Sequence, residues 1–229
     1  MLGLDALTYV FLAVRVARMR LPESGHVSLV DQTAARGGLA LLRSHPELLG
    51  LLTLTWFFNL LYGPVEVALP LHVTDDLHAP STLGLYWMLF GIGAVLGGLA
   101  VGALRQLPLW PVTVVTVVAW GLALLPFGFD VPTAVTVACF TLGGAIYGPS
   151  VALSVTLMQA KSPPQHLAVM LTARSTALPT ASPLGTALGG QLTTALGPRA
   201  TLGGSGLATV VLGAVACFLL PSARRSPAW

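Results

Sequence analysis

Six long apolar segments restrict what this chain can fold into more than any other feature of its sequence. They cover residues 48–71, 82–104, 110–128, 132–157, 167–195 and 201–220. About 20 apolar residues are enough for an α-helix to cross the roughly 30 Å hydrocarbon core of a bilayer. Within lipid every backbone polar group needs an internal partner, which helices provide. The sequence therefore predicts an all-α membrane protein with a six-helix transmembrane bundle over residues 48–220.

The scarcity of charged residues supports this class. Only 8% of the 229 residues are charged and 55% are hydrophobic, whereas a soluble domain carries about 25% charged residues. The net charge of +3 comes from basic residues near the ends of the apolar segments, not from a basic stripe. We therefore expect a lipid bilayer around the protein and no nucleic-acid partner.

The chain begins with an apolar stretch that is too short to cross a membrane. Residues 1–14 form an apolar run with a basic cluster directly behind it. We interpret this run as the end of a transmembrane helix and the chain as the back part of a larger membrane protein. Residues 15–47 are predicted to form a cytoplasmic linker with a short amphipathic helix from Ser28 to Ser44, and residues 221–229 a cytoplasmic tail.

The distribution of lysine and arginine predicts the orientation in the membrane. If the linker is cytoplasmic, most basic residues fall on the same side: Arg15, Arg18, Arg20, Arg36, Arg43, Arg105, Lys161, Arg224 and Arg225. Arg199 falls on the other side, together with Asp75, Asp76 and Asp130. We therefore expect a multi-pass protein of the cell membrane with a cytoplasmic C-terminus.

Glycines spaced four residues apart predict close helix packing. Such small-xxx-small pairs let helix backbones approach each other in lipid. The expected packing residues are Gly93, Gly97, Gly98, Gly102, Gly144, Gly148, Gly185 and Gly189.

Several motifs, taken in order, resemble a known family. The first apolar segment follows Arg43-x-His45-Pro46 and contains Asn59-x-x-Tyr62-Gly63-Pro64-x-Glu66. Later come Gly144-x-x-x-Gly148-Pro149, Pro163-Pro164-Gln165-His166 and Pro183-Leu184-Gly185. Over nearly the whole chain this pattern is similar to the C-terminal half of a major facilitator superfamily transporter, in the drug-exporter branch that includes macrolide and siderophore efflux proteins.

The resemblance implies a twelve-helix, proton-coupled antiporter that exports small hydrophobic or amphipathic solutes by alternating access. It also implies a partner, an N-terminal six-helix half that is missing or separate. The segments 48–71 and 132–157 would line the central cavity. Two cytoplasmic loops depart from the branch: Ala168-Val169 replace an expected Gly-Arg, and only Arg105 remains of a usually more charged loop.

Glu66 is the leading candidate for function. A carboxylate within an apolar segment costs a few kcal/mol and marks a functional site or a buried pair. Asn59 and Tyr62 lie seven and four residues earlier on the same helical face. We interpret the three residues as a polar stripe facing a cavity. The alternatives are a carboxylate that reaches the helix end and hydrogen bonds between helices.

Arg174, Tyr147 and Ser150 are the other candidates. Arg174 lies about two turns inside an apolar segment and needs a partner, for which Glu66 is one possibility if their depths agree. The alternative is a structural role, in which Arg174 bonds to helix-end carbonyls or to lipid phosphate. Tyr147 and Ser150 flank Gly148-Pro149, where a proline kink could expose backbone carbonyls.

The sequence lacks the residue patterns that nucleotide hydrolysis and metal binding require. The sequence has no phosphate-binding loop and no His, Cys and carboxylate spacing typical of a metal site. We therefore expect no enzyme activity, no cofactor and no metal. The alternatives to an exporter half are a transport-incompetent fragment or a membrane scaffold that pairs with a partner half.

Overall fold

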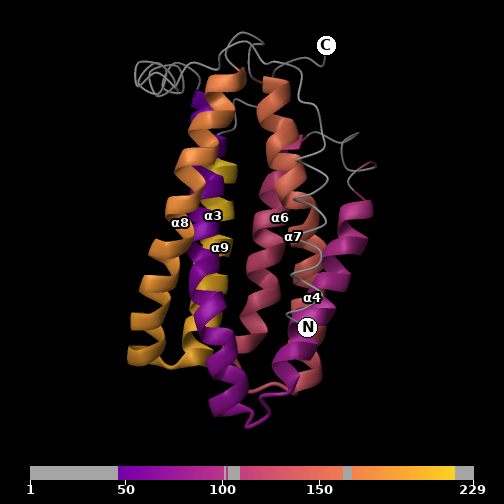
Figure 1. The fold of residues 1–229 in the computed structure, drawn as a ribbon, viewed down its shortest axis with the longest axis vertical. Coiled ribbons are helices and arrows are strands. Elements are labelled where there is room, and N and C mark those ends of the chain that lie inside the picture. Colours follow the sequence, from indigo (N-terminus) through magenta and orange to yellow (C-terminus); the bar gives the residue numbers. More distant parts are fainter. Residues whose placement is uncertain (1–45, 101, 103–108, 162–166, 220–229) are drawn as a thin grey trace, which may run out of the picture. The chain divides into compact units, whose positions relative to one another are not determined.

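The computed structural model describes residues 46–100, 102, 109–161 and 167–219, which form six long α-helices (Figure 1). These are α3 (Pro46–Leu71), α4 (Thr82–Leu99), α6 (Leu109–Leu124), α7 (Thr133–Lys161), α8 (Leu167–Leu196) and α9 (Pro198–Leu219). A π-helix, η1 (His72–Asp76), extends α3, and a 3-10 helix, η2 (Leu125–Gly128), extends α6. The predicted all-α fold is confirmed. The partial helix 1–14, the amphipathic helix 28–44 and the tail 221–229 lie outside the described residues.

Helix α9 begins at Pro198, three residues earlier than the apolar pattern indicated, because one glycine suffices to end α8. Gly197 has a φ of +83°, in the left-handed region that glycine adopts without strain. Its N–H donates to the carbonyl of Thr193 at 3.0 Å. Pro198 then occupies the start of α9, where its missing N–H costs nothing.

The long helices of the bundle are candidates for membrane spans. Four segments are long and apolar enough to cross a membrane: Leu49–Asp76, Thr82–Leu99, Trp110–Gly128 and Pro198–Phe218. Helices α7 and α8 have 29 and 30 residues, enough to span the hydrocarbon core by length. The described side chains of α7 include the apolar stretch Thr133–Pro149.

The six helices pack in pairs that follow an internal symmetry. Helix α3 packs on α8, α4 on α7, and α6 on α9, with further contacts between α3 and α9 and between α6 and α7 (Figure 1). If α3, α4 and α6 are exchanged with α7, α8 and α9, the pair α3–α8 turns into α4–α7, the pair α3–α9 turns into α6–α7, and the pair α6–α9 turns into itself. We refer to the two groups as the first and second three-helix repeats, an organisation found in many transporters.

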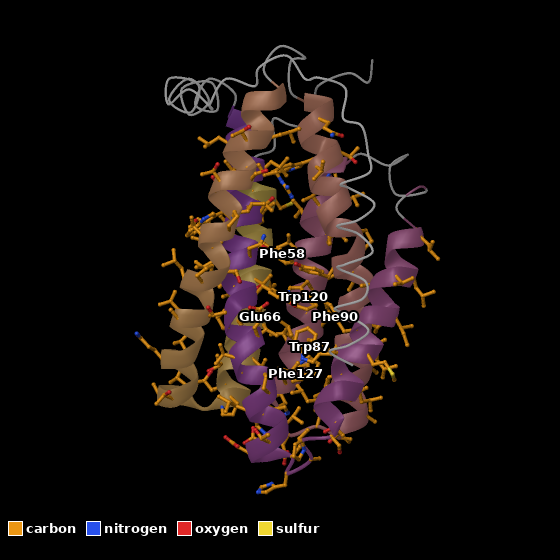
Figure 2. The ribbon with its side chains drawn as sticks, viewed as in Figure 1. Phe58, Glu66, Trp87, Phe90, Trp120 and Phe127 are labelled. Carbon is orange, nitrogen blue, oxygen red and sulfur yellow. The ribbon has the colours of Figure 1, made fainter. Side chains whose placement is uncertain are left out.

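A column of aromatic rings fills the space between α3, α4, α6 and α7. Figure 2 shows Phe58, Trp120, Phe90, Trp87 and Phe127 succeeding one another along this space. Neighbouring rings lie 5.0–6.5 Å apart, mostly edge to face or tilted, as aromatic pairs prefer. We call the following set the aromatic column: Phe58, Tyr62, Tyr86, Trp87, Phe90, Trp120, Phe127, Phe140 and Tyr147.

Charged side chains join three connections at the end of the bundle where α3 stops. Nδ1 of His72 lies 2.7 Å from Oδ2 of Asp76, and Nε of Arg199 lies 3.5 Å from the same oxygen. Nη1 of Arg199 also donates to Oδ1 of Asp130 at 3.0 Å. The network links the π-helix after α3, the start of α9 and the segment between η2 and α7.

Candidate functional site

The middle of α3 offers a carbonyl without its usual helical donor. Pro64 has no N–H, so the carbonyl of Leu60 loses the hydrogen bond of a regular helix. Gly185 of α8 lies against that carbonyl, and Gly189, one turn later, lies against Pro64. A Cβ atom at either glycine would come within 3.0 Å of the α3 backbone. These two glycines therefore let α8 pack directly on the proline-containing turn of α3.

Helix α7 repeats this arrangement against α4. Pro149 deprives the carbonyl of Ala145 of its donor, and Gly97 of α4 lies against that carbonyl. Gly148, next to the proline, lies against the backbone of Ala94. The equivalent helices of the two repeats thus carry the same tripeptide at their contact, Tyr62-Gly63-Pro64 and Tyr147-Gly148-Pro149. This repeated tripeptide is the feature of the sequence that could have indicated the equivalence of α3 and α7.

The two tyrosines of this tripeptide meet where α3 and α7 approach each other. Their ring centroids lie 5.2 Å apart with an angle of 24° between the planes, a stacked pair. Phe58 also stacks on Tyr147 at 6.0 Å and 25°. Trp120 of α6 lies 5.7 Å from both tyrosine rings. The stack therefore joins the first repeat to the second within the aromatic column.

Glu66 lies one helical turn beyond Tyr62 and is exposed on the described bundle (Figure 2). Its carboxylate is close enough to interact electrostatically with both Tyr62 and Tyr147. Within residues 46–100, 109–161 and 167–219, no hydrogen bond or ion pair reaches the carboxylate. Glu66 is therefore an accessible acid beside a pair of phenols that come from different repeats.

Asn59 forms a hydrogen bond within its own helix. Its side-chain amide donates to the carbonyl of Thr55 in the same helix, at 2.7 Å. This bond lies within α3. It is therefore not the hydrogen bond between helices that the sequence offered as an alternative. Ser150, the other polar neighbour of Pro149, has a side chain outside the described part of the structure.

Arg174 and Glu66 lie at different levels of the bundle. Nε1 of Trp56 in α3 donates to Oγ1 of Thr180 in α8 at 3.0 Å, which fixes the register of two helices that run in the same direction. Arg174 precedes Thr180 by six residues, whereas Glu66 follows Trp56 by ten residues in the opposite direction. At about 1.5 Å per residue, the two side chains start roughly 24 Å apart along the helix axes. The structure therefore does not bring these two candidates together.

The expected packing glycines divide into two groups. Six lie against a neighbouring backbone, namely Gly93, Gly97, Gly144, Gly148, Gly185 and Gly189. Gly98 and Gly102 instead face open space among the described residues, with no atom within 4 Å of a Cβ placed there. Their spacing was right for a contact, but α7 lies on the face of α4 that carries Gly93 and Gly97. The expectation for Gly98 and Gly102 is therefore corrected.

Comparison with known proteins shows the family of this chain. Residues 5–229 match the sequence profile of the Major Facilitator Superfamily. The chain belongs to the Major Facilitator Superfamily. It is also 29% identical over 214 residues to the "Uncharacterized MFS-type transporter y4rN" of Sinorhizobium fredii (strain NBRC 101917 / NGR234). This alignment covers 88% of the chain and 50% of the relative.

Family membership and the apolar helices together identify a multi-pass membrane protein. The chain spans about half the length of the curated relative that it matches. Within the described helices, no group of three or more His, Cys, Asp or Glu side chains could hold a metal ion. Cys139 and Cys217 are free thiols on α7 and α9. Among the described residues, Glu66 beside the stacked tyrosines is a candidate site for function.

Proposed function

We propose that this chain forms the C-terminal six-helix half of a secondary-active exporter and works with an N-terminal six-helix half. Two observations support the proposal. The chain aligns with about half of an MFS-type relative, and its helices pack as two three-helix repeats, the internal organisation of one transporter half.

The exposed face of α8 supports a protein neighbour on that side of the bundle. Its exposed residues include small and polar ones, namely Ser175, Thr176, Thr180, Gln191 and Thr194, and toward its C-terminal end also four leucines, Leu184, Leu188, Leu192 and Leu196. The exposed face of α4, by contrast, carries large aliphatic side chains, namely Met88, Ile92, Val95, Leu96 and Leu99. Lipid tails solvate the aliphatic face well, whereas interfaces between membrane helices are enriched in small and hydroxyl residues. The N-terminal half would cover the α8 face.

Glu66 is the proposed site of proton coupling, and the observation that carries this assignment is its exposed carboxylate beside the Tyr62–Tyr147 stack. Ionisable residues in membrane helices are costly and typically mark proton or solute pathways. Glu66 lies near one tyrosine of each repeat. Its carboxylate would therefore bind a proton in one orientation of the bundle and a solute in the other. We propose export of small hydrophobic or amphipathic solutes across the cell membrane, with the C-terminus in the cytoplasm.

A vesicle experiment tests this function. Inverted membrane vesicles that contain the chain with its partner half would be acidified inside, and ethidium or erythromycin would be added as solute. An exporter that exchanges protons for solute releases protons from these vesicles when the solute is added. Glu66→Gln should abolish this proton release, because glutamine keeps the shape of the side chain and cannot ionise.

Glu47→Gln is the matched control, since Glu47 lies in the first turn of the same helix. This variant should keep wild-type proton release. Retained release in Glu66→Gln would return Glu66 to a structural role. If the wild-type protein gave no release with any solute of a broad panel, while folding and reaching the membrane normally, the result would favour the membrane scaffold.

A further inference from the structure

Arg199 occupies an unusual position at the end of the bundle where α3 stops. It lies in the first turn of α9, where a positive charge opposes the helix dipole. Two carboxylates reach it from other parts of the chain, Asp76 from η1 and Asp130 from the segment between η2 and α7. The position of Arg199 is therefore explained by the partners outside α9 and not by the stability of α9 itself.

One of these carboxylates has two donors on the same oxygen. Oδ2 of Asp76 lies 2.7 Å from Nδ1 of His72 and 3.5 Å from Nε of Arg199. Because an ionised carboxylate only accepts hydrogen bonds, Nδ1 of His72 carries a hydrogen atom, and Nε2 is the ring nitrogen that takes up a further proton. The two donors therefore compete for one oxygen, and the charge of His72 affects which of them it holds more strongly.

His72 and Arg199 differ in how firmly the surrounding structure holds them. His72 is 4% exposed, and its ring lies edge to face on Phe127 of η2 at 5.9 Å. The side chain of Arg199 is 39% exposed and has a second partner in Asp130, whose side chain is 91% exposed. Arg199 is thus the donor that can leave Asp76, whereas His72 is packed in place.

We propose that His72, Asp76, Arg199 and Asp130 form a proton-sensitive clamp, in which proton uptake by His72 releases Arg199 from Asp76 and frees the end of α3 from the start of α9. An imidazolium binds a carboxylate more strongly than a neutral imidazole does, and its positive charge repels that of Arg199. Arg199 then keeps only the solvent-exposed Asp130, which is a weak partner. Histidine changes its charge between pH 5 and 8, so mild acid opens the clamp.

The other titratable side chains around His72 in the described structure lie outside the clamp: Glu66 of α3, Asp75 of η1, His78 before α4, Tyr86 of α4 and Cys139 of α7. The hydroxyl of Tyr86 is paired with Oγ1 of Thr136. The described residues of α6 and η2, and residues 175–196 of α8, contain no titratable side chain. His78 is therefore the neighbour that changes charge in the same pH range, and it provides a control.

Distance measurements by double electron–electron resonance test the clamp. Nitroxide labels would be attached to Thr74→Cys in η1 and Leu207→Cys in α9, both exposed positions, in a chain whose own cysteines are replaced by alanine. In lipid nanodiscs at about pH 8 the labels should give one short distance. At about pH 5.5 a longer distance should appear beside it. The ratio of short to long should fall about fivefold, as expected for the loss of one partly exposed ion pair.

Two matched pairs of variants assign this response to the clamp. His72→Asn keeps a donor near the position of Nδ1 but takes up no proton, so it should keep the short distance at both pH values. His78→Asn should respond like the wild type. Asp76→Asn should show the longer distance at both pH values, whereas the change in its exposed neighbour, Asp75→Asn, should leave the wild-type response.

The wild type itself supplies the outcome that would overturn the proposal, namely the same distances at both pH values. A wild-type pH response in His72→Asn would also overturn it. If near-ultraviolet circular dichroism shows that His72→Asn does not fold, Arg199→Gln replaces it, because this change affects a half-exposed side chain. Arg199→Gln should show the longer distance at both pH values, and a wild-type response there would equally contradict the clamp. The clamp does not depend on the proposed role of Glu66, so the vesicle assay with Glu66→Gln is a separate test.

Discussion

The two repeats contain the same contact between a proline-containing helix and a glycine-rich helix, but they surround it with different side chains. Where α7 packs on α4, Trp87, Phe90 and Phe140 of the aromatic column add ring contacts to the backbone contact. Where α3 packs on α8, α8 contributes no aromatic ring, and the side chains of Trp56 and Thr180 form a hydrogen bond. The α4–α7 pair is thus fixed by large rings, and the α3–α8 pair by close backbone approach.

This difference separates an anchored pair from a pair suited to movement. Large interlocking rings have few alternative arrangements in a close-packed interior. Small side chains between parallel helices allow sliding with little steric cost, and Gly185 and Gly189 form this contact on α8. We expect α8 to shift more readily than the α4–α7 pair, which should keep its geometry.

The largest expected effect comes from the centre of the aromatic column. Trp120 is 1% exposed and touches rings from α3, α4 and α7. Trp120→Ala should lower the free energy of unfolding by about 3–5 kcal/mol, as measured by SDS titration in mixed micelles. Trp56→Ala on the α8 side should cost about 1 kcal/mol, since Trp56 is half-buried. Equal losses in the two variants would remove the distinction between the pairs.

Neighbouring glycines on α4 provide the next test. A Cβ at Gly97 would collide with the Ala145 backbone, whereas a Cβ at Gly98 would meet nothing within 4 Å. Gly97→Ala should therefore destabilise the protein by about 1–3 kcal/mol. Gly98→Ala should stabilise it by about 0.5–1 kcal/mol, because alanine favours a helix over glycine. Both variants add the same methyl group, so the contact predicts changes in the free energy of unfolding with opposite signs. Changes with the same sign would contradict the described packing.

The same comparison on α8 should give a smaller contrast. Gly189 lies against Pro64, and Gly190 faces open space. Because no rings hold α8 in place, it can shift to accept a methyl group, and Gly189→Ala should cost about 1 kcal/mol, the low end for overpacking. Gly190→Ala should be neutral or slightly stabilising. A loss at Gly189 as large as that at Gly97 would show that both pairs are equally rigid.

Much of the fold could be predicted because lipid leaves the backbone few options. The apolar length located all six helices, although it placed the start of α9 three residues late, since Pro198 and Gly197 read as a loop. Glycine spacing was less informative. Gly93 and Gly97 lie at a contact, while Gly98 and Gly102, with identical spacing, meet no neighbour within the described part of the chain, because spacing does not fix the rotation of a helix about its axis.

The candidate site was predicted only in parts. Glu66 stood out because a carboxylate in an apolar segment is costly, and Tyr62 because it shares a helical face with Glu66. That Tyr147 would stack on Tyr62 depends on how α3 and α7 pack, which local patterns do not encode. The repeated Tyr-Gly-Pro tripeptide, interpreted as a sign of two equivalent helices, would have indicated this meeting. The distance between Arg174 and Glu66 likewise needed the register of α3 and α8.

Proton release on solute binding tests the central claim most directly. The purified transporter, consisting of this chain and its partner half, would be mixed with ethidium or erythromycin in weakly buffered detergent solution containing a pH indicator. The account predicts that the wild-type protein releases protons in proportion to bound solute and that Glu66→Gln binds solute without releasing them. Equal proton release from Glu66→Gln and wild type would contradict the assignment of Glu66 as the coupling site.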